Sequence, residues 1–194
     1  MGNHFIAILF ILSFLLCPDL LSGQQKYESE SRMRSEEVPT EAMHFFDAFQ
    51  NKRKVRWYLE EGLDRKSIEA KFKLNRQKYS IEFDALGQFE DVEIEIRKKE
   101  IPESTLEKIK SQLSLDCGKF KIQKVQTQYS GDKSAVLSTI TKASRSDAVT
   151  IKYELVVKCK SGNNSSLLEY LFSESGEKLA VSEIVFKNSS HLEY

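Results

Sequence analysis

The sequence has few of the residues that mark specialised protein classes. Among 194 residues there are three cysteines, three prolines, eight glycines, three histidines and one tryptophan. So little proline and glycine excludes collagen-like and low-complexity chains. Basic and acidic residues are equal in number at 29 each, so the chain lacks the positive excess of a nucleic-acid-binding protein. We therefore expect no nucleic-acid partner.

Long apolar runs are also scarce, and the one clear example lies at the N-terminus. Residues 5–17 are apolar except for Ser13, and the chain then passes through the small residues Ser22 and Gly23. Such a run has the length of a signal-peptide hydrophobic region and is shorter than the roughly 20 residues that span a bilayer. We expect a signal peptide at residues 1–23, cleaved near Gly23, no membrane span, and a periplasmic or secreted protein.

Cys17 stands where the lipid-bearing cysteine of a lipoprotein would stand, directly after the apolar run. A lipobox has a small residue before that cysteine, whereas this chain has Leu16. A cysteine inside a discarded signal peptide is therefore the favoured interpretation, and lipidation of Cys17 is the alternative.

The rest of the chain shows one pattern twice. Residues 24–37 are polar and without periodicity, which predicts a flexible leader. The first unit, residues 38–98, opens at Pro39 with apolar residues at helical spacing: Ala42, Phe45, Phe46 and Phe49. Apolar and polar residues then alternate in four segments: 55–59, 68–74, 79–83 and 92–96. This alternation predicts four antiparallel strands, each with one buried and one wet face.

The second unit, residues 99–187, begins at Ile101-Pro102. Its predicted helix has an apolar face made of Leu106, Ile109 and Leu113. Strands are expected at 120–126, 150–158, 167–172 and 179–186. An insertion near 129–147 predicts a lengthened hairpin or mobile loop, and residues 188–194 form a tail. The predicted fold class is α+β, with two tandem repeats of a helix plus a four-stranded antiparallel sheet.

Both units resemble the PepSY-like domains of exported bacterial proteins, a group described as beta-lactamase-inhibitor-like (BLIP-like). The segments that carry the resemblance are 54–58, 68–72, 79–87 and 91–102. The match is close in the first unit and looser in the second, where Ser173 stands in the place of the turn residue Asp84. The resemblance implies the tandem-repeat architecture and, through the name of the group, inhibition of an extracytoplasmic enzyme.

The two cysteines downstream of the apolar run are placed for a disulfide. Cys117 precedes the first strand of the second unit and Cys159 ends its second strand. In an antiparallel hairpin the start of one strand lies beside the end of the next, so we expect a bridge, with two free thiols as the alternative. A bridge across these 42 positions would stabilise the fold by about 4 kcal/mol.

No recognisable catalytic or cofactor-binding motif is present. His44 lies next to an apolar helix face and His191 lies in the polar tail, and neither has a recognisable nucleophile or orienting acid. Two cysteines and two distant histidines do not make a four-ligand zinc site. We therefore predict a non-enzyme, with no catalytic residues, no metal site and no cofactor.

An acidic row in the first unit could bind a cation. Its members are Glu90, Asp91, Glu93 and Glu95. Glu93 and Glu95 occupy outward positions of one predicted strand, and lysines 71, 73 and 78 lie on neighbouring strands. A solvated face with cross-strand charge pairs is therefore the favoured interpretation.

The leading functional hypothesis is an exported, non-catalytic binding or inhibitory module of the cell envelope that acts on a protein partner through its sheet surfaces. In the first unit, Arg56 and Tyr58 lie on the polar sheet face. In the second, Val156, Leu167 and Leu171 break the alternation and place apolar groups opposite the core. We predict that these five residues bind the partner, although intramolecular cover of the apolar three is an alternative.

A second function remains open at this point. The chain could be an envelope ligand-binding or stress-related protein with an apolar cleft between the repeats. The sequence leaves the oligomeric state and the identity of the partner undetermined.

Overall fold

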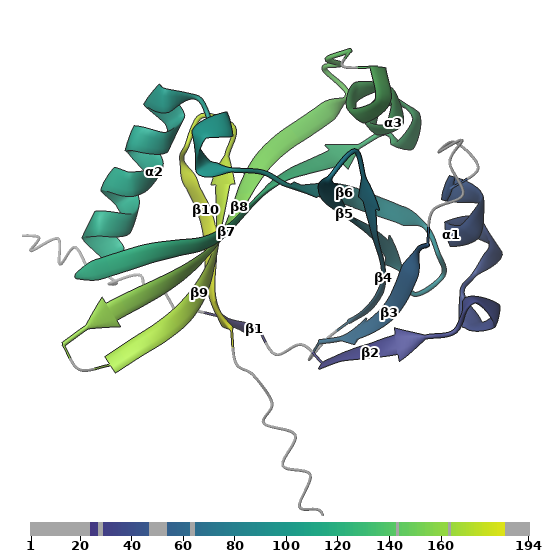
Figure 1. Cartoon of the computed structure of the whole chain (residues 1–194), viewed down its shortest axis with the longest axis horizontal. Coiled ribbons are helices and arrows are strands. Elements are labelled where there is room, and N and C mark those ends of the chain that lie inside the picture. Colours follow the sequence, from purple (N-terminus) through teal and green to yellow (C-terminus); the bar gives the residue numbers. More distant parts are fainter. Residues whose placement is uncertain are drawn as a thin grey trace, which may run out of the picture.

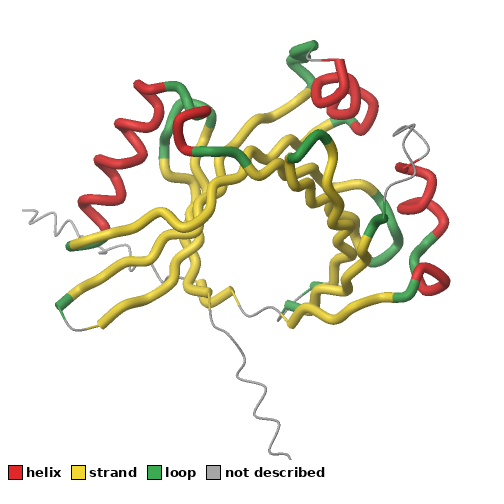
Figure 2. The backbone as a smooth tube through the Cα atoms, viewed as in Figure 1, coloured by secondary structure: helices red, strands yellow, loops and turns green. Residues whose placement is uncertain are grey.

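We analysed a computed structural model, which describes residues 24–26, 29–46, 54–62, 65–142, 144–162 and 164–184. The predicted signal peptide, Cys17, Phe49 and the tail lie outside the described residues. The elements, in chain order, are β1 Gln24–Lys26, β2 Ser29–Met33, η1 Ser35–Glu37, α1 Thr40–Phe45, β3 Arg56–Glu61, β4 Lys66–Leu74, β5 Gln77–Asp84, β6 Phe89–Glu95, η3 Lys98–Glu100, α2 Glu103–Asp116, β7 Lys119–Gly131, α3 Lys133–Lys142, β8 Val149–Ser161, β9 Asn164–Ser173 and β10 Lys178–Ile184 (Figures 1 and 2).

The described strands form one sheet of ten, in the order β1-β10-β9-β8-β7-β6-β5-β4-β3-β2. Neighbouring strands are antiparallel, apart from β1, which pairs with β10 in parallel. The prediction of two separate repeats, each with its own four-stranded sheet, is wrong. β6 pairs with β7 from Asp91 opposite Ser130 to Glu95 opposite Gln126, so the sheet continues without a break.

Strand length explains this continuity. β7 and β8 have 13 residues each, long enough to cover the second core and to extend alongside β6. The described helices are fewer than the strands, and α1 has only six residues. The protein is therefore mostly β. None of the helices among the described residues combines the length and hydrophobicity needed to cross a bilayer.

The insertion near 129–147 lengthens the β7–β8 hairpin and also contains a helix, α3. Oδ1 of Asp132 accepts a hydrogen bond from the backbone N–H of Ala135, at 2.9 Å, and so caps the first turn. Val136 is fully buried, and Leu137 and Ile140 pack with it against the core of the first half. The predicted loop is thus part of the cover of the sheet.

Residues 24–37, expected to be a flexible leader, instead supply β1, β2 and η1. β2 pairs with β3, from Ser29 opposite Glu61 to Met33 opposite Trp57. β1 pairs with β10 at the other edge, so consecutive strands end on opposite edges of one strongly curved sheet (Figure 1). The alternation signal was missing because β2 is an edge strand that contributes little to the core beyond Met33.

All three α-helices lie on the outer, convex face of this sheet (Figures 1 and 2). Two apolar clusters fill the space beneath them. Under α1 and α3, Phe45 stacks on Phe89 with ring centroids 5.0 Å apart. Under α2, Leu113 and Phe172 are fully buried. Because side chains alternate along strands, the polar residues between these core positions lie on the concave face, which no helix covers.

The predicted disulfide is confirmed. Cys117, at the end of α2, is bonded to Cys159 of β8, with a Cα–Cα distance of 5.4 Å. Both residues lie in the second core, where the hydroxyl of Tyr170 is 3.6 Å from Sγ of Cys117. The bridge ties the helix to the sheet that it covers.

Candidate binding surface

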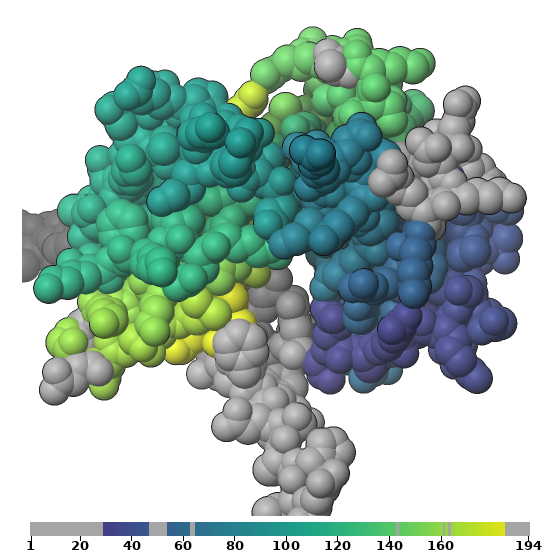
Figure 3. All heavy atoms as spheres, viewed as in Figure 1, coloured from purple at the N-terminus to yellow at the C-terminus, as the bar shows by residue number. Residues whose placement is uncertain are grey.

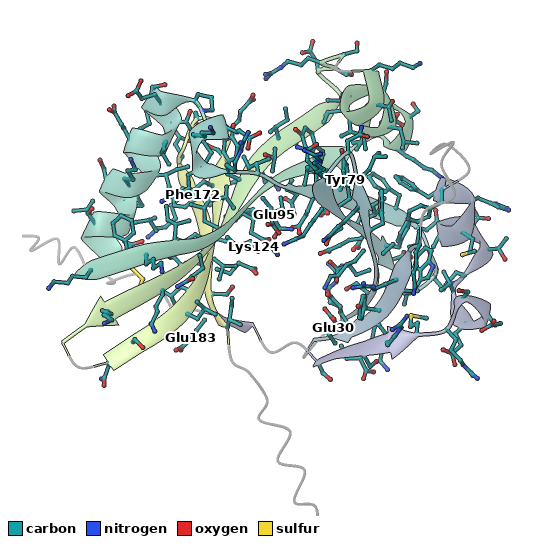
Figure 4. The ribbon with its side chains drawn as sticks, in the orientation of Figure 1. Glu30, Tyr79, Glu95, Lys124, Phe172 and Glu183 are labelled. Carbon is teal, nitrogen blue, oxygen red and sulfur yellow. A yellow bond between two sulfur atoms is a disulfide. The ribbon has the colours of Figure 1, made fainter. Side chains whose placement is uncertain are left out.

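The concave face combines charged side chains from strands that are distant in the sequence. Strand register places on it polar residues of the first half, which are Arg56, Tyr58, Glu69, Lys71, Lys78, Ser80, Glu82, Glu93 and Glu95. The space-filling view shows the surface hollowed between the two halves of the sheet (Figure 3). Figure 4 shows Phe172 on the α2 side, and Glu30, Glu95 and Lys124 on the concave side.

A pocket of about 630 Å³ opens at one end of this face. Its lining comes from β4 to β7 and from the start of β3. Six of the lining side chains are basic: Lys54, Arg56, Lys71, Lys73, Lys78 and Lys124. Glu95 is the one acidic member, and Phe72, Tyr79 and Ser80 complete the wall. We call this feature the basic pocket.

The positive charge of the basic pocket is only partly neutralised. Nζ of Lys78 lies 2.8 Å from Oε2 of Glu95. Lys54, Arg56 and Lys124 are exposed and form no ion pair with any described residue. Converging, unpaired cations favour an anionic group such as a carboxylate or a phosphate.

Further along the face, three carboxylates surround the ammonium group of Lys71. Oxygen atoms of Glu30, Glu60 and Glu69 lie within 4.8 Å of one another. Nζ of Lys71 lies 2.5 Å from Oε2 of Glu30 and 2.6 Å from Oε2 of Glu69. We call these three acids the lysine-paired trio.

A second group of carboxylates lies on the adjoining strands β5 and β6. Oxygen atoms of Glu82, Asp91 and Glu93 also lie within 4.8 Å of one another. Two members of this group accept hydrogen bonds from amides. Nε2 of Gln126 donates to Oε2 of Glu93 at 2.7 Å, and Nε2 of Gln128 donates to Oδ2 of Asp91 at 3.1 Å. Neither Asp91 nor Glu93 forms an ion pair with a described residue. We call these acids the amide-paired trio.

The two trios respond differently to burial. Burial alone would raise the pKa of Glu69, but hydrogen bonds from Glu60, Lys71 and Ser80 together hold that pKa below its usual value. In the amide-paired trio, burial and then repulsion from Glu154 raise the pKa of Asp91 to about 7.

Glu93 is shifted in the same direction as Asp91. Its side chain is only 6% exposed, and burial is the main cause that raises its pKa well above the usual value. Repulsion from Glu154, Glu82 and Asp91 adds to this effect. Ionisation of Asp91 and Glu93 is therefore unfavourable in the folded protein, whereas ionisation of Glu69 is favoured.

Solved structures from Bacteroides species are similar to this chain in fold. A "putative periplasmic" protein from Bacteroides eggerthii has a TM-score of 0.52 and 11% identity over 79% of this chain and 94% of its own. A DUF2874 family protein from Bacteroides uniformis has a TM-score of 0.50 and 12% identity, covering 75% of this chain and 89% of its own. A BLIP-like protein from Bacteroides fragilis has a TM-score of 0.48 and 14% identity, covering 79% and 92%.

Identities this low show likeness of fold alone. Neither the family models nor the curated protein sequences compared with the chain match it. The resemblance to PepSY-like domains therefore stays a prediction.

The five predicted partner-binding residues all lie on the concave face, but in two places. Arg56 lines the basic pocket, and the ring of Tyr58 lies 4.9 Å below Nζ of Lys71. The apolar three are half-buried on β8 and β9, each opposite a charged residue: Val156 opposite Glu169, Leu167 opposite Lys158 and Leu171 opposite Glu154. The insertion does not cover them, because α3 packs on the convex face.

The expected solvated acidic row is confirmed for Glu95, which pairs with Lys78, and is wrong for Asp91 and Glu93, which are buried. The cause is the join between β6 and β7, which brings Gln126 and Glu154 beside these acids. Neither Gln126 nor Glu154 was predicted from the sequence to lie at this site. The polar alternation of Gln126 and Gln128 was the available signal, but it became informative only with the strand order known.

Proposed function

We propose that this protein is an extracytoplasmic, non-catalytic binding protein that takes an acidic segment of a protein partner into its basic pocket. The basic pocket carries the proposal. Six basic side chains line it, and three of them, Lys54, Arg56 and Lys124, have no ion pair with a described residue. An acidic side chain entering this pocket would gain charge-assisted hydrogen bonds without displacing an internal partner.

The extracytoplasmic location is supported by two observations. The apolar run at residues 5–17 has the length of a signal-peptide hydrophobic region. The disulfide between Cys117 and Cys159 is typical of proteins that fold in oxidising compartments. The Bacteroides eggerthii protein of similar fold is itself described as periplasmic, which agrees with this location.

The rest of the concave face would orient the partner. Leu167, Leu171 and Val156 lie on the same face as the basic pocket, where Val156 is directly opposite the pocket residue Lys124. Charged residues of β8 and β9 separate the three apolar side chains. Mixed apolar and charged surfaces of this kind suit a protein better than a small apolar ligand. We propose that these three residues form the second contact region, with Tyr58 beside the basic pocket.

A small anion is the second candidate ligand. The volume of about 630 Å³ falls in the range of small-molecule sites, and Phe72 and Tyr79 offer apolar surface beside the cations. The two candidates differ in whether affinity depends on the length of an acidic peptide.

The test is fluorescence anisotropy with labelled glutamate peptides of increasing length, with inorganic phosphate as competitor. The pocket variant is Lys54→Gln/Arg56→Gln/Lys124→Gln. The matched control, Lys98→Gln/Lys99→Gln/Lys119→Gln, removes the same charge from exposed lysines that do not line the pocket. We expect the pocket variant to bind the longer peptides roughly tenfold more weakly or worse, and the control to bind them nearly as the wild type does.

Equal losses in the two variants would show that only overall charge matters and would refute the proposal. Strong competition by phosphate, with no gain from peptide length, would favour the small anion. The variant Leu167→Ser/Leu171→Ser tests the second contact region. Weaker binding at an unchanged melting temperature would support this region. A large fall in melting temperature would show that the two leucines belong to the core and would refute it.

A further inference from the structure

We propose that the amide-paired trio, with the side-chain oxygen of Gln126, binds a hard divalent cation of the Ca²⁺ type. This site lies outside the lining of the basic pocket, and the inference does not depend on the proposed function.

The spacing of the carboxylates fits such an ion. Ca²⁺ binds oxygen ligands at about 2.3–2.6 Å, so two ligands of one ion are at most about 5 Å apart. Oxygen atoms of Glu82, Asp91 and Glu93 lie within 4.8 Å of one another. Glu82 and Asp91 are direct cross-strand neighbours on β5 and β6, so the sheet itself holds this spacing.

Two buried oxygens supply independent evidence for a ligand. Oε1 of Gln126 and Oδ1 of Asp91 are buried, and no described residue donates a hydrogen bond to either. Gln126 is only 3% exposed, and its Nε2 donates to Glu93, so its Oε1 lies beside the same carboxylate. A buried acceptor without a donor costs about 1–3 kcal/mol. A bound cation would give such an oxygen the partner that it lacks.

The two trios differ in whether a lysine lies among the acids. Both have three carboxylates within the same spacing, but the lysine-paired trio has the ammonium group of Lys71 among them. Near Asp91 the cations are Lys152 and Arg65, and Arg65 pairs with Glu90. A cation from solution would take the place that Lys71 takes in the other trio.

The donor set favours Ca²⁺ over other metals. The trio and Gln126 offer carboxylate and amide oxygens and neither a thiolate nor an imidazole, which suits a hard cation. Mg²⁺ requires nearly octahedral geometry at about 2.0–2.1 Å, whereas Ca²⁺ accepts irregular sets of six to eight oxygens. The carboxylates come from two strands in fixed register and the amide comes from a third strand. Such an arrangement of oxygen ligands is irregular.

The test is isothermal titration calorimetry of the full-length exported protein after EDTA treatment, with CaCl₂ and separately MgCl₂ at pH 7.5. We expect one Ca²⁺ per chain with a dissociation constant on the order of 1 mM or below, and weaker Mg²⁺ binding. The variant Asp91→Asn/Glu93→Gln should lose at least roughly tenfold in affinity. The matched control is Glu95→Gln, on the same strand and face but outside the trio.

The double variant removes buried negative charge, so we expect it to fold, and near-ultraviolet circular dichroism checks this. A second variant, Gln126→Ala, keeps all the carboxylates and tests the amide oxygen by itself. The proposal is overturned if the wild type binds no Ca²⁺, if both variants bind it as the wild type does, or if Mg²⁺ binds more tightly. It is equally overturned if Glu95→Gln loses as much affinity as the double variant.

Discussion

The lysine-paired and amide-paired trios share one sheet face and the same spacing of oxygens, yet their electrostatics are opposite. In the first, burial raises the pKa of Glu69, but hydrogen bonds with Glu60, Lys71 and Ser80 together hold it below its usual value. In the second, glutamines occupy the neighbouring positions, and the pKa values of Asp91 and Glu93 rise. An amide offers a hydrogen bond without cancelling charge. Two clusters of like composition therefore differ in the partners of their acids, which include an ammonium group only in the first.

The two trios are also expected to have different roles on this face. A cluster with an internal cation needs nothing from solution, so the lysine-paired trio is expected to be structural. Buried oxygens without a hydrogen bond occur in both, but Oε2 of Glu69 lies 2.6 Å from the ammonium group of Lys71, whereas Oδ1 of Asp91 forms no ion pair with a described residue. Buried groups with perturbed pKa values are more frequent at functional sites than elsewhere. We therefore expect variants of the two trios to differ in their dependence on pH and on added cation.

The largest expected effect is the pH dependence of the amide-paired trio in metal-free protein. The pKa of Asp91 is about 7 when folded, against about 3.9 in the unfolded chain. Between these values the folded protein keeps a proton that the unfolded chain has released. The free energy of unfolding should therefore fall as pH rises from about 4 to about 7, by about 3 kcal/mol in total from this group, as measured by urea unfolding.

The charged groups that face Asp91 set the control for this measurement. They are Glu82 from β5, Glu90 and Glu93 from β6, Glu154 and Lys152 from β8, and Arg65 at the start of β4. Asp91→Asn should remove the part of the fall that comes from Asp91 and leave the part that comes from Glu93, whose pKa is also raised. A slope unchanged in this variant would contradict the assignment. Glu69 has the opposite sign: its pKa is lowered, so its contribution is lost only as pH falls below about 4.

The second prediction removes the internal cation. Lys71→Met leaves Glu69, which is 5% exposed, without its ammonium partner. Loss of one partner of a buried pair costs about 3–5 kcal/mol, but Lys71 is 37% exposed and solvent screens part of the interaction. We expect a loss of about 2 kcal/mol at pH 7.5 by urea unfolding. Lys121→Met, at an exposed position of β7, should cost far less, and equal losses would contradict the role of Lys71.

The sequence predicted the parts of the fold that depend on local pattern. Alternation placed strands within β4 and β5, and the positions of Cys117 and Cys159 predicted their bridge. The join between β6 and β7 was not predictable in this way, because pairing between distant strands leaves no local periodicity. The edge strand β2 was missed for a related reason, since backbone hydrogen bonds to β3 hold it more than apolar side chains do.

The same limit applied to the charged residues. Glu95 and Lys78 belong to strands that are adjacent in the chain, so their pairing could be predicted from hairpin topology. Glu93 meets Gln126, from a strand beyond α2, and its burial depends on the curvature of the whole sheet. Residue type and alternation alone therefore predicted a wet face where the structure has a buried cluster.

The third prediction concerns a substitution that gives the amide-paired trio an internal cation like that of the lysine-paired trio. Gln126→Lys would place an ammonium group beside Glu93, where the amide nitrogen now donates at 2.7 Å. We expect metal-free protein to gain about 1 kcal/mol of stability at pH 7.5, because the new cation offsets the buried negative charge. The thermal stabilisation by CaCl₂ should disappear in this variant. A destabilised variant that still responds to CaCl₂ would show that the missing cation is not what separates the two trios.

The smallest expected effect is at Glu95, which shares β6 and the concave face with Glu93 but lies toward solvent. Its ion pair with Lys78 has a distance of 2.8 Å, and the two side chains are 36% and 58% exposed. Exposed pairs contribute about 0–1 kcal/mol, because water screens the attraction and the long side chains lose freedom. Glu95→Gln should therefore change the free energy of unfolding by less than about 0.5 kcal/mol. Glu93→Gln, two residues earlier on the same face, should stabilise metal-free protein measurably at pH 7.5. If the two variants behave alike in urea unfolding, burial is not the property that distinguishes these acids, and the contrast between the trios fails with it.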